Sequence, residues 1–218
     1  MTSKSQTTKQ RILDAAEELF AREGFASVTV RQIMKKAGAD VALAYYHFES
    51  KRDLFDAVLM RRAELMNDLR HAALDEVERR HPDDAPSIEE IIAAFTNPLL
   101  DLLARDHEQW RHYFALIAQV NNSPEWGGEL MTRFFDPLVR RFIDAIRRAV
   151  PDAADEELYW SYHFLSGALT LTFAETGRID NLSNGLCKSS DMQSISERLP
   201  AFVAAGFARL CAKGRAAS

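Results

Sequence analysis

Apolar residues recur at the spacing of an α-helix along this chain, and that period constrains the fold more than any other feature. Near the N-terminus, an apolar residue stands at every position of one helical face. No stretch shows the strict alternation that is typical of strands, and no internal repeat is present. The sequence therefore predicts an all-α fold. The residues of this first face are Ile12, Ala15, Ala16, Leu19 and Phe20.

Capping signals then divide the region after this helix into short pieces. Thr29 is followed three residues later by Gln32, which is the pattern of a capping box, and "VRQIMKKA" ends before Gly38. Asp40 is a suitable N-cap for a helix over 41–47. Such short helices are too weak to stand alone, so we expect them to share a small core.

Longer helices follow. Ser50 begins a helical pattern that continues to about Arg79, and "HPDDAPS" interrupts it. The region 178–192 reads as a loop. Further helices are expected at about 87–106, 108–120, 126–149, 154–177 and 194–212.

Composition places the chain among globular proteins, with 47% hydrophobic and 27% charged residues. No apolar run approaches the ~20 residues that span a bilayer, and the polar start "MTSKSQTTKQ" has no secretion signal. Cys187 and Cys211 lie far apart, which suits a reducing compartment. We expect a cytoplasmic protein with no membrane partner.

Charge is distributed unevenly. The net charge is -5, but residues 1–60 hold nine basic and eight acidic residues. The N-terminal part is thus slightly basic and the remainder acidic. This asymmetry permits a nucleic-acid contact near the N-terminus without requiring one.

The helices at 29–37 and 41–47, joined through Gly38, have the arrangement of a helix-turn-helix motif. The second helix of such a motif enters the major groove of DNA. Tyr45, Tyr46 and His47 could then face outward and donate to phosphate, while Phe48 anchors the helix in the core. The alternative is a helix end that packs against a neighbour.

The segment "TTKQRILDAAEELFAREGFASVTVRQIMKKAGADVALAYYHFESKRDLF" resembles the DNA-binding domain of the TetR (tetracycline-repressor) family of bacterial regulators. The resemblance covers roughly the first 55 residues without a gap. It implies a three-helix DNA-binding domain over 1–50. A ligand-binding and dimerisation helical domain would follow over 51–218, with about nine helices in all.

By position, the resemblance implies a set of DNA contacts. Residues of the recognition helix would face the bases, and residues at two helix starts would meet phosphate. Many relatives have Gly or Thr where this chain has apolar residues, so the base preference does not follow. Arg31, Lys35 and Lys36 could equally be solvated. The expected DNA-binding residues are Thr29, Arg31, Val41, Ala42, Leu43, Tyr45, Tyr46, His47 and Lys51.

The middle helices are rich in aromatic residues, as the walls of a pocket for a small organic ligand would be. Aromatic residues at helical spacing are also ordinary core residues, so this alternative stays open. The candidates for ligand binding are Trp110, Tyr113, Phe114, Met131, Phe134, Phe135, Trp160, His163 and Phe164.

The last two helices mix large apolar residues with Ser, Gly and Ala at helical spacing. Such helices can pack closely in a four-helix homodimer interface or within one chain. The phrase "TGRIDNLSNGLCKSSDM" also resembles a subgroup of the TetR family with fatty-acid-responsive repressors, and this favours an apolar effector.

The sequence thus predicts a dimeric regulator, a repressor that binds a palindromic operator and is released by an apolar or aromatic effector. An enzyme is a poorer reading, because no Gly-rich phosphate loop, Gly-x-Ser-x-Gly or metal-spaced Cys/His cluster is present. We expect no cofactor and no metal. A helical adaptor would leave "YYHFESK" without a role.

Overall fold

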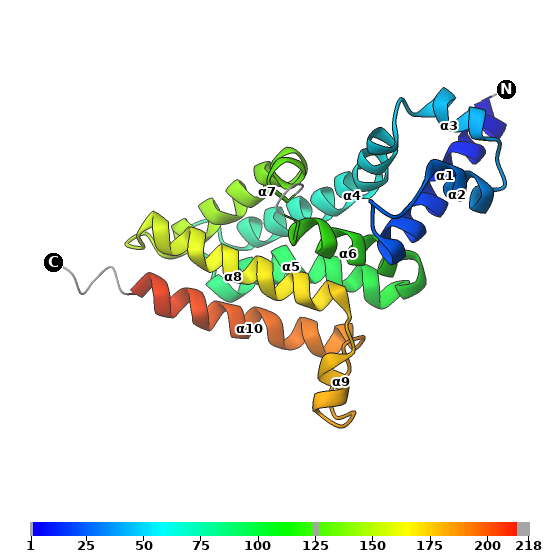
Figure 1. The fold of residues 1–218 in the computed structure, drawn as a ribbon. Coiled ribbons are helices and arrows are strands. Elements are labelled where there is room, and N and C mark those ends of the chain that lie inside the picture. The colour runs from blue at the N-terminus through cyan, green and yellow to red at the C-terminus, as the bar shows by residue number, and fades with distance from the viewer. Residues whose placement is uncertain (1, 124–126, 213–218) are drawn as a thin grey trace.

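The structure is a computed structural model that describes residues 2–123 and 127–212 (Figure 1). The described residues form helices joined by turns and loops, which confirms the predicted all-α class. In the described ranges these helices are α1 (Thr2–Glu23), α2 (Val30–Ala37), α3 (Val41–His47), α4 (Lys51–Arg80), α5 (Ile88–Arg105), α6 (His107–Asn121), α7 (Gly127–Ala149), α8 (Asp155–Ala174), α9 (Arg178–Leu182) and α10 (Met192–Cys211).

The predicted capping box at the start of α2 is formed. The Thr29 hydroxyl accepts from the Gln32 amide at 3.3 Å, and the Gln32 side chain accepts from the Thr29 amide at 2.7 Å. Gly38 ends the helix at φ 60°, a left-handed conformation that glycine adopts without strain. Asp40 then accepts from the Ala42 amide at 2.8 Å and caps α3. These local signals position the two short helices.

A small aromatic core holds α1, α2 and α3 against the start of α4. The rings of Phe20, Phe25 and Phe55 lie 5.2–5.6 Å apart, in tilted and edge-to-face arrangements. Ile33 from α2 and Ala44 from α3 are buried in the same core. This packing supplies the stability that such short helices lack alone.

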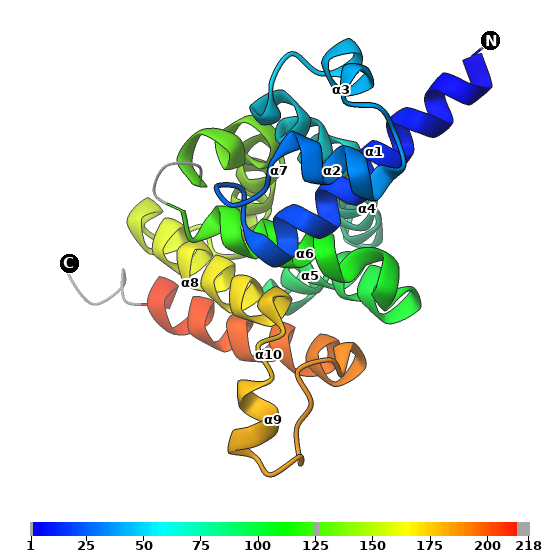
Figure 2. The same ribbon diagram turned by 45° about the vertical axis from the view of Figure 1, so that its right-hand side comes forward.

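Helix α4 continues from this core into a bundle made with α5, α6, α7, α8 and α10 (Figure 1). Helices α8 and α10 lie side by side at one edge of the bundle. The predicted loop at 178–192 is partly wrong, because it contains the short helix α9, which projects from the bundle (Figures 1 and 2). Five residues are too few to reveal a helical period. Among the described helices, none has both the length and the apolar character needed to cross a bilayer.

Candidate DNA-binding surface and ligand cavity

The outer face of α3 is open to solvent. Tyr45 and Tyr46 are 66% and 78% exposed, and Val41 and Leu43 are each 37% exposed. Only Ala44 on this helix is buried. The tyrosine rings therefore do not pack against a neighbouring element, and their contact with DNA stays a prediction.

The inner end of α3 is fixed by Phe48. This ring is buried, as expected, and the Lys9 ammonium lies 5.7 Å from its centroid. The half-buried His47 ring packs edge-on against Tyr46, with centroids 4.9 Å apart. Helix α3 is thus anchored at its end while it exposes the side chains of Val41, Leu43, Tyr45 and Tyr46.

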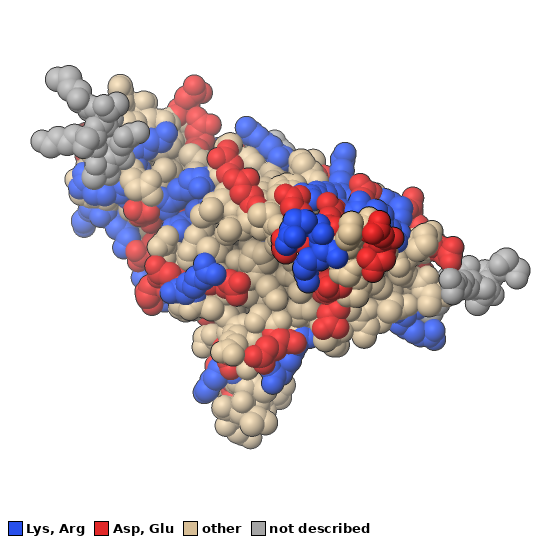
Figure 3. All heavy atoms as spheres, turned by 180° about the vertical axis from the view of Figure 1, so that it is seen from behind, with Lys and Arg blue, Asp and Glu red and all other residues tan. Residues whose placement is uncertain are grey.

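Thr29 and Arg31 at the start of α2 are exposed beside α3, where they line a shallow depression together with Val41, Tyr45 and Lys51. The Thr29 hydroxyl already donates to the Gln32 side chain at 2.6 Å. A phosphate contact by this hydroxyl would have to redirect that proton. Figure 3 shows Lys and Arg side chains gathered at the end of the molecule that carries α1–α3, whereas both signs mix over the rest of this face.

Lys51 has a structural role that the sequence did not predict. Its ammonium donates to the carbonyls of Phe25 and Val28, at 2.8 Å each, and lies 4.2 Å from the centroid of the Phe25 ring. Two of its three N–H donors therefore hold the loop between α1 and α2. The phosphate contact expected of Lys51 stays a prediction and would have to use the remaining donor.

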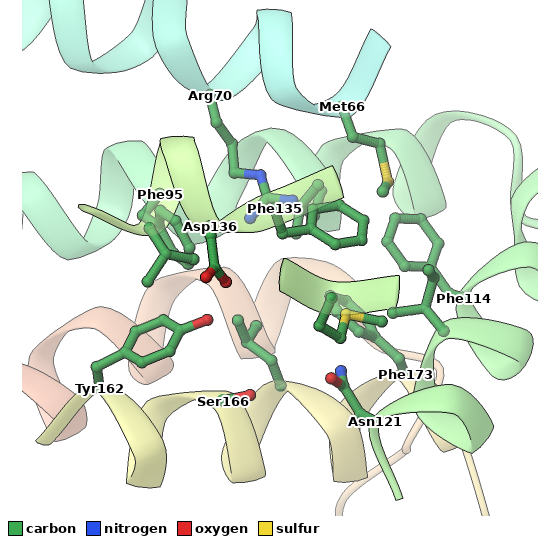
Figure 4. Close-up of a pocket in the computed structure, with 15 residues that line it drawn as sticks. Met66, Arg70, Phe95, Phe114, Asn121, Phe135, Asp136, Tyr162, Ser166 and Phe173 are labelled. Atoms are coloured by element: carbon green, nitrogen blue, oxygen red, sulfur yellow. The ribbon is translucent and has the colours of Figure 1, made fainter. Parts of the chain in front are cut away.

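Helices α4, α5, α6, α7 and α8 enclose a cavity of about 80 Å³ (Figure 4). Of the nine residues predicted to bind ligand, Phe114, Met131 and Phe135 line it. Most of the other walls are apolar. The polar side chains that also line the cavity are Arg70, Asn121, Asp136, Tyr162 and Ser166.

Three of the predicted ligand residues are buried or half-buried elsewhere. Trp110 lies under the guanidinium of Arg62, 4.6 Å from its ring, and the Tyr113 hydroxyl donates to the Leu59 carbonyl at 2.9 Å. Phe134 is half-buried beside the cavity but does not line it. These three side chains do not line the cavity, and their contact with a ligand stays a prediction.

Trp160, His163 and Phe164, also predicted to bind ligand, lie on the outer face of α8 and do not line this cavity. Trp160 is 50% and Phe164 is 60% exposed, and their rings stack 6.0 Å apart. The face of α8 that turns inward carries Leu158, Ser161, Leu165, Leu169 and Phe173 instead. A helical period shows which residues share a face, but not which face the bundle covers.

Sequence reasoning also missed Arg70. It occupies a place in the inward stripe of α4 between Met66 and Leu74, where an apolar residue is expected. Burial lowers the pKa of its guanidinium to about 10, so it stays charged at neutral pH. Burial also raises the pKa of Tyr162 on the facing wall. The sequence signal that could have identified Arg70 is a cationic residue at a position where the helical pattern calls for an apolar one.

Comparison with known proteins agrees with this architecture. A profile for "Bacterial regulatory proteins, tetR family" matches residues 12–58, and a profile for "Tetracyclin repressor-like, C-terminal domain" matches residues 93–206. The second match covers more than half of the 218 residues. This chain belongs to the TetR family. The TetR family consists of regulatory proteins, which confirms the prediction that the chain is not an enzyme.

Named relatives match only part of this TetR-family chain. It is 40% identical over 60 residues to the HTH-type transcriptional regulator SrpR of Pseudomonas putida, which is 28% of either chain. It is 31% identical over 127 residues to the HTH-type transcriptional repressor BepR of Brucella suis, covering 56% of this chain and 54% of BepR.

Solved structures show the same fold at low identity. The fatty acid degradation regulator FadR from Bacillus halodurans has a TM-score of 0.62 at 14% identity, over 91% of this chain and 95% of that one. FadR from Bacillus subtilis, in complex with stearoyl-CoA, has a TM-score of 0.57 at 16% identity, over 90% and 98%. At this identity the likeness establishes the fold alone.

Proposed function

We propose that this TetR-family chain is a dimeric repressor of the bacterial cytoplasm that binds a palindromic operator and is released by a small apolar or aromatic effector. The observation that carries this proposal is the open face of α3, where Val41, Leu43, Tyr45 and Tyr46 are exposed on a capped and anchored helix. An exposed aromatic face of this kind has a physical purpose if it meets thymine methyl groups and sugar–phosphate backbone.

The division of labour along the chain supports the proposal. We assign DNA binding to residues 1–50 and effector binding and dimerisation to residues 51–218, with the first turns of α4 packed in the N-terminal core through Phe55. Two helices connect the cavity to α1. Helix α4 carries Met66 and Arg70 at the cavity, and α6 carries Phe114 there.

The same two helices hold α1 directly. Arg61 and Arg62 of α4 bind Glu17 of α1, and the Gln119 side chain of α6 donates to the Ala21 carbonyl at 2.5 Å. The cavity of about 80 Å³ is smaller than the ~300 Å³ of typical ligand pockets. An effector would therefore have to push the walls of the cavity apart, and a shift of α4 or α6 would move α1. Effector and operator would then weaken each other's binding by the same factor.

Dimerisation would use the outer face of α8 together with α10. Trp160, Phe164 and Leu171 are exposed on α8, and Phe202 is exposed on α10. Exposed large apolar residues gathered on one helix face are characteristic of an interface. To read successive major grooves, the two α3 helices of such a two-fold dimer would have to lie about 34–36 Å apart.

Selection from random duplex DNA tests the function. The wild type should enrich a palindromic sequence, and Tyr46→Ala should lose it while keeping its unfolding temperature, because Tyr46 is 78% exposed. Leu65→Ala on α4, also exposed and outside the proposed dimer interface, is the control and should enrich the same sequence. Operator affinity should fall steeply with salt. Absence of any enrichment by the folded dimer would refute the proposal.

A further inference from the structure

The cavity contains a buried cation that has no anionic partner in the described part of the chain. Arg70 is 5% exposed, in the inward stripe of α4. Its Nε has no hydrogen-bond partner, and no carboxylate of the described residues forms an ion pair with it. Figure 4 shows the side chain extending from α4 into the cavity.

Aromatic rings are the principal neighbours of this guanidinium. Its centre lies 4.8 Å from the centroid of Phe95 and 5.7 Å from that of Phe135. Such rings offset part of the lost hydration, but they leave the N–H donors unused. Tyr113 supplies no negative charge to Arg70, because burial keeps its hydroxyl neutral and that hydroxyl donates to the Leu59 carbonyl.

Asp136 is the carboxylate that lines the same cavity, but it is engaged differently. Its Oδ2 lies 3.9 Å from a guanidinium nitrogen of Arg140, and its side chain is 37% exposed. In Figure 4 its carboxylate points toward Tyr162 on the opposite wall. Arg70 therefore contributes a positive charge to the cavity that no carboxylate of the described residues neutralises.

An unpaired buried charge is unfavourable for folding, and replacing the charged residue by an apolar one of similar volume usually stabilises the protein. We propose that Arg70 is the specificity-determining residue for the effector, and that the effector carries a carboxylate on an apolar body. This inference rests on the proposed effector cavity and narrows the class of molecule that it accepts. The planar fork of the guanidinium matches the two oxygens of a carboxylate.

The number of charges favours a monoanion. Arg70 is the one Lys or Arg among the described residues that line the cavity, and Asp136 adds a negative charge nearby. A phosphate dianion would therefore be under-compensated. The apolar body would lie against Phe114, Met131 and Phe173, and because the cavity is small it would push these side chains and their helices apart.

Titration calorimetry on the full chain tests this with octanoate, octan-1-ol and octanoyl-CoA as probes. The wild type should bind octanoate about tenfold or more tightly than octan-1-ol, because the alcohol leaves the guanidinium unpaired. Arg70→Met should lose this preference and keep its affinity for the alcohol. Arg79→Met, at an exposed position of the same helix, should behave as the wild type.

Equal binding of acid and alcohol by the wild type would overturn the inference. So would octanoate binding that Arg70→Met leaves unchanged, binding of octanoyl-CoA alone, or binding of none of the probes. A second measurement needs no ligand: Arg70→Met should unfold at the same temperature as the wild type or higher. A large loss of stability would mean that Arg70 serves the fold.

Probe binding and DNA selection are independent readouts. If octanoate binds through Arg70 but no operator is enriched, the regulatory function fails and the ligand class stands. If an operator is enriched but no acid preference is found, the ligand class fails and the regulator stands. The two proposals can thus be separated on one protein preparation.

Discussion

The carboxylate of Glu17 on α1 is held by Arg62 on α4 through two parallel hydrogen bonds, of 2.8 Å from Nε and 3.0 Å from Nη2. Arg61 adds a third bond of 2.7 Å from Nη2 to the same carboxylate. Glu17 is only 4% exposed, and Arg62 also stacks on Trp110 of α6. Three helices therefore meet at one ionic cluster, and this cluster orients the DNA-binding helices relative to the cavity.

Replacing Glu17 by Gln should destabilise the protein by about 2–4 kcal/mol, because the partly buried Arg62 loses its anion and Arg61 keeps only the exposed Asp14. Operator affinity should fall as well, since α1 would no longer be held at a fixed angle to α4. Chemical denaturation and DNA titration measure the two effects.

The matched control is Glu18→Gln, the neighbouring carboxylate on α1. Glu18 pairs with Arg22 and Lys36 near the surface, so its loss should cost less than about 1 kcal/mol. Equal costs for the two substitutions would show that the cluster around Glu17 contributes nothing special.

Lys51→Met should lower the free energy of unfolding by about 1–3 kcal/mol, because the carbonyls of Phe25 and Val28 lose a charged donor. Lys35→Met, at an exposed position of α2, should leave stability unchanged. Denaturant titration measures this. Lys51→Met could instead keep full stability while the slope of log operator affinity against log salt concentration falls by about one unit. Lys51 would then contact phosphate and have no structural role.

Phe164→Asp should dissociate the proposed dimer, because it places a charge in the centre of the apolar face of α8, next to the stacked Trp160. The dissociation constant should rise roughly 30-fold or more, measured by sedimentation equilibrium. Leu65→Asp is the control, since Leu65 is exposed on α4, away from α8. If both variants remain dimeric, the interface lies elsewhere.

Glu90 should make stability depend on pH in the acid range. Hydrogen bonds from the hydroxyl and amide of Ser87, and then from His81, lower the pKa of Glu90 from its usual 4.5 to about 2. A lowered carboxyl pKa stabilises the fold above the usual pKa, and this contribution disappears as pH falls through the folded value.

Glu90→Gln should consequently unfold at a lower temperature than the wild type at pH 5.5, and the gap should close by about pH 2. Thermal unfolding followed by circular dichroism across this range measures it. Glu89→Gln, on the exposed side of the same first turn, should show a smaller gap throughout. A gap that stays constant with pH would contradict the capping role of the ionised Glu90.

The recognition helix shows how much of a candidate site can be predicted from sequence. Asp40 as N-cap, Phe48 as anchor and the outward Tyr45 and Tyr46 all follow from signals within about ten residues of chain. Helix caps and short-range amphipathicity depend on residues that are close in sequence, so they can be predicted without the positions of the neighbouring helices. The order and approximate limits of the longer helices were predictable for the same reason.

The cavity could not be predicted in the same way. Phe114 and Phe135 line it, whereas Trp160 and Phe164, equally aromatic and equally periodic, face outward. Trp160 and Phe164 face outward because the bundle covers the opposite surface of α8. Contacts between residues far apart in the chain decide which surface is covered.

The sequence by itself thus determined the all-α class, the caps, the helix-turn-helix and its exposed tyrosines. Only the tertiary structure decided that Lys51 binds the α1–α2 loop, that Glu17 joins α1 to α4, and that Arg70 turns its charge into a cavity. The physical reason is the separation in sequence of the residues that interact. Hydrogen bonds near a helix end are set by neighbours in sequence, but the burial of a charge is set by elements that fold together from distant parts of the chain.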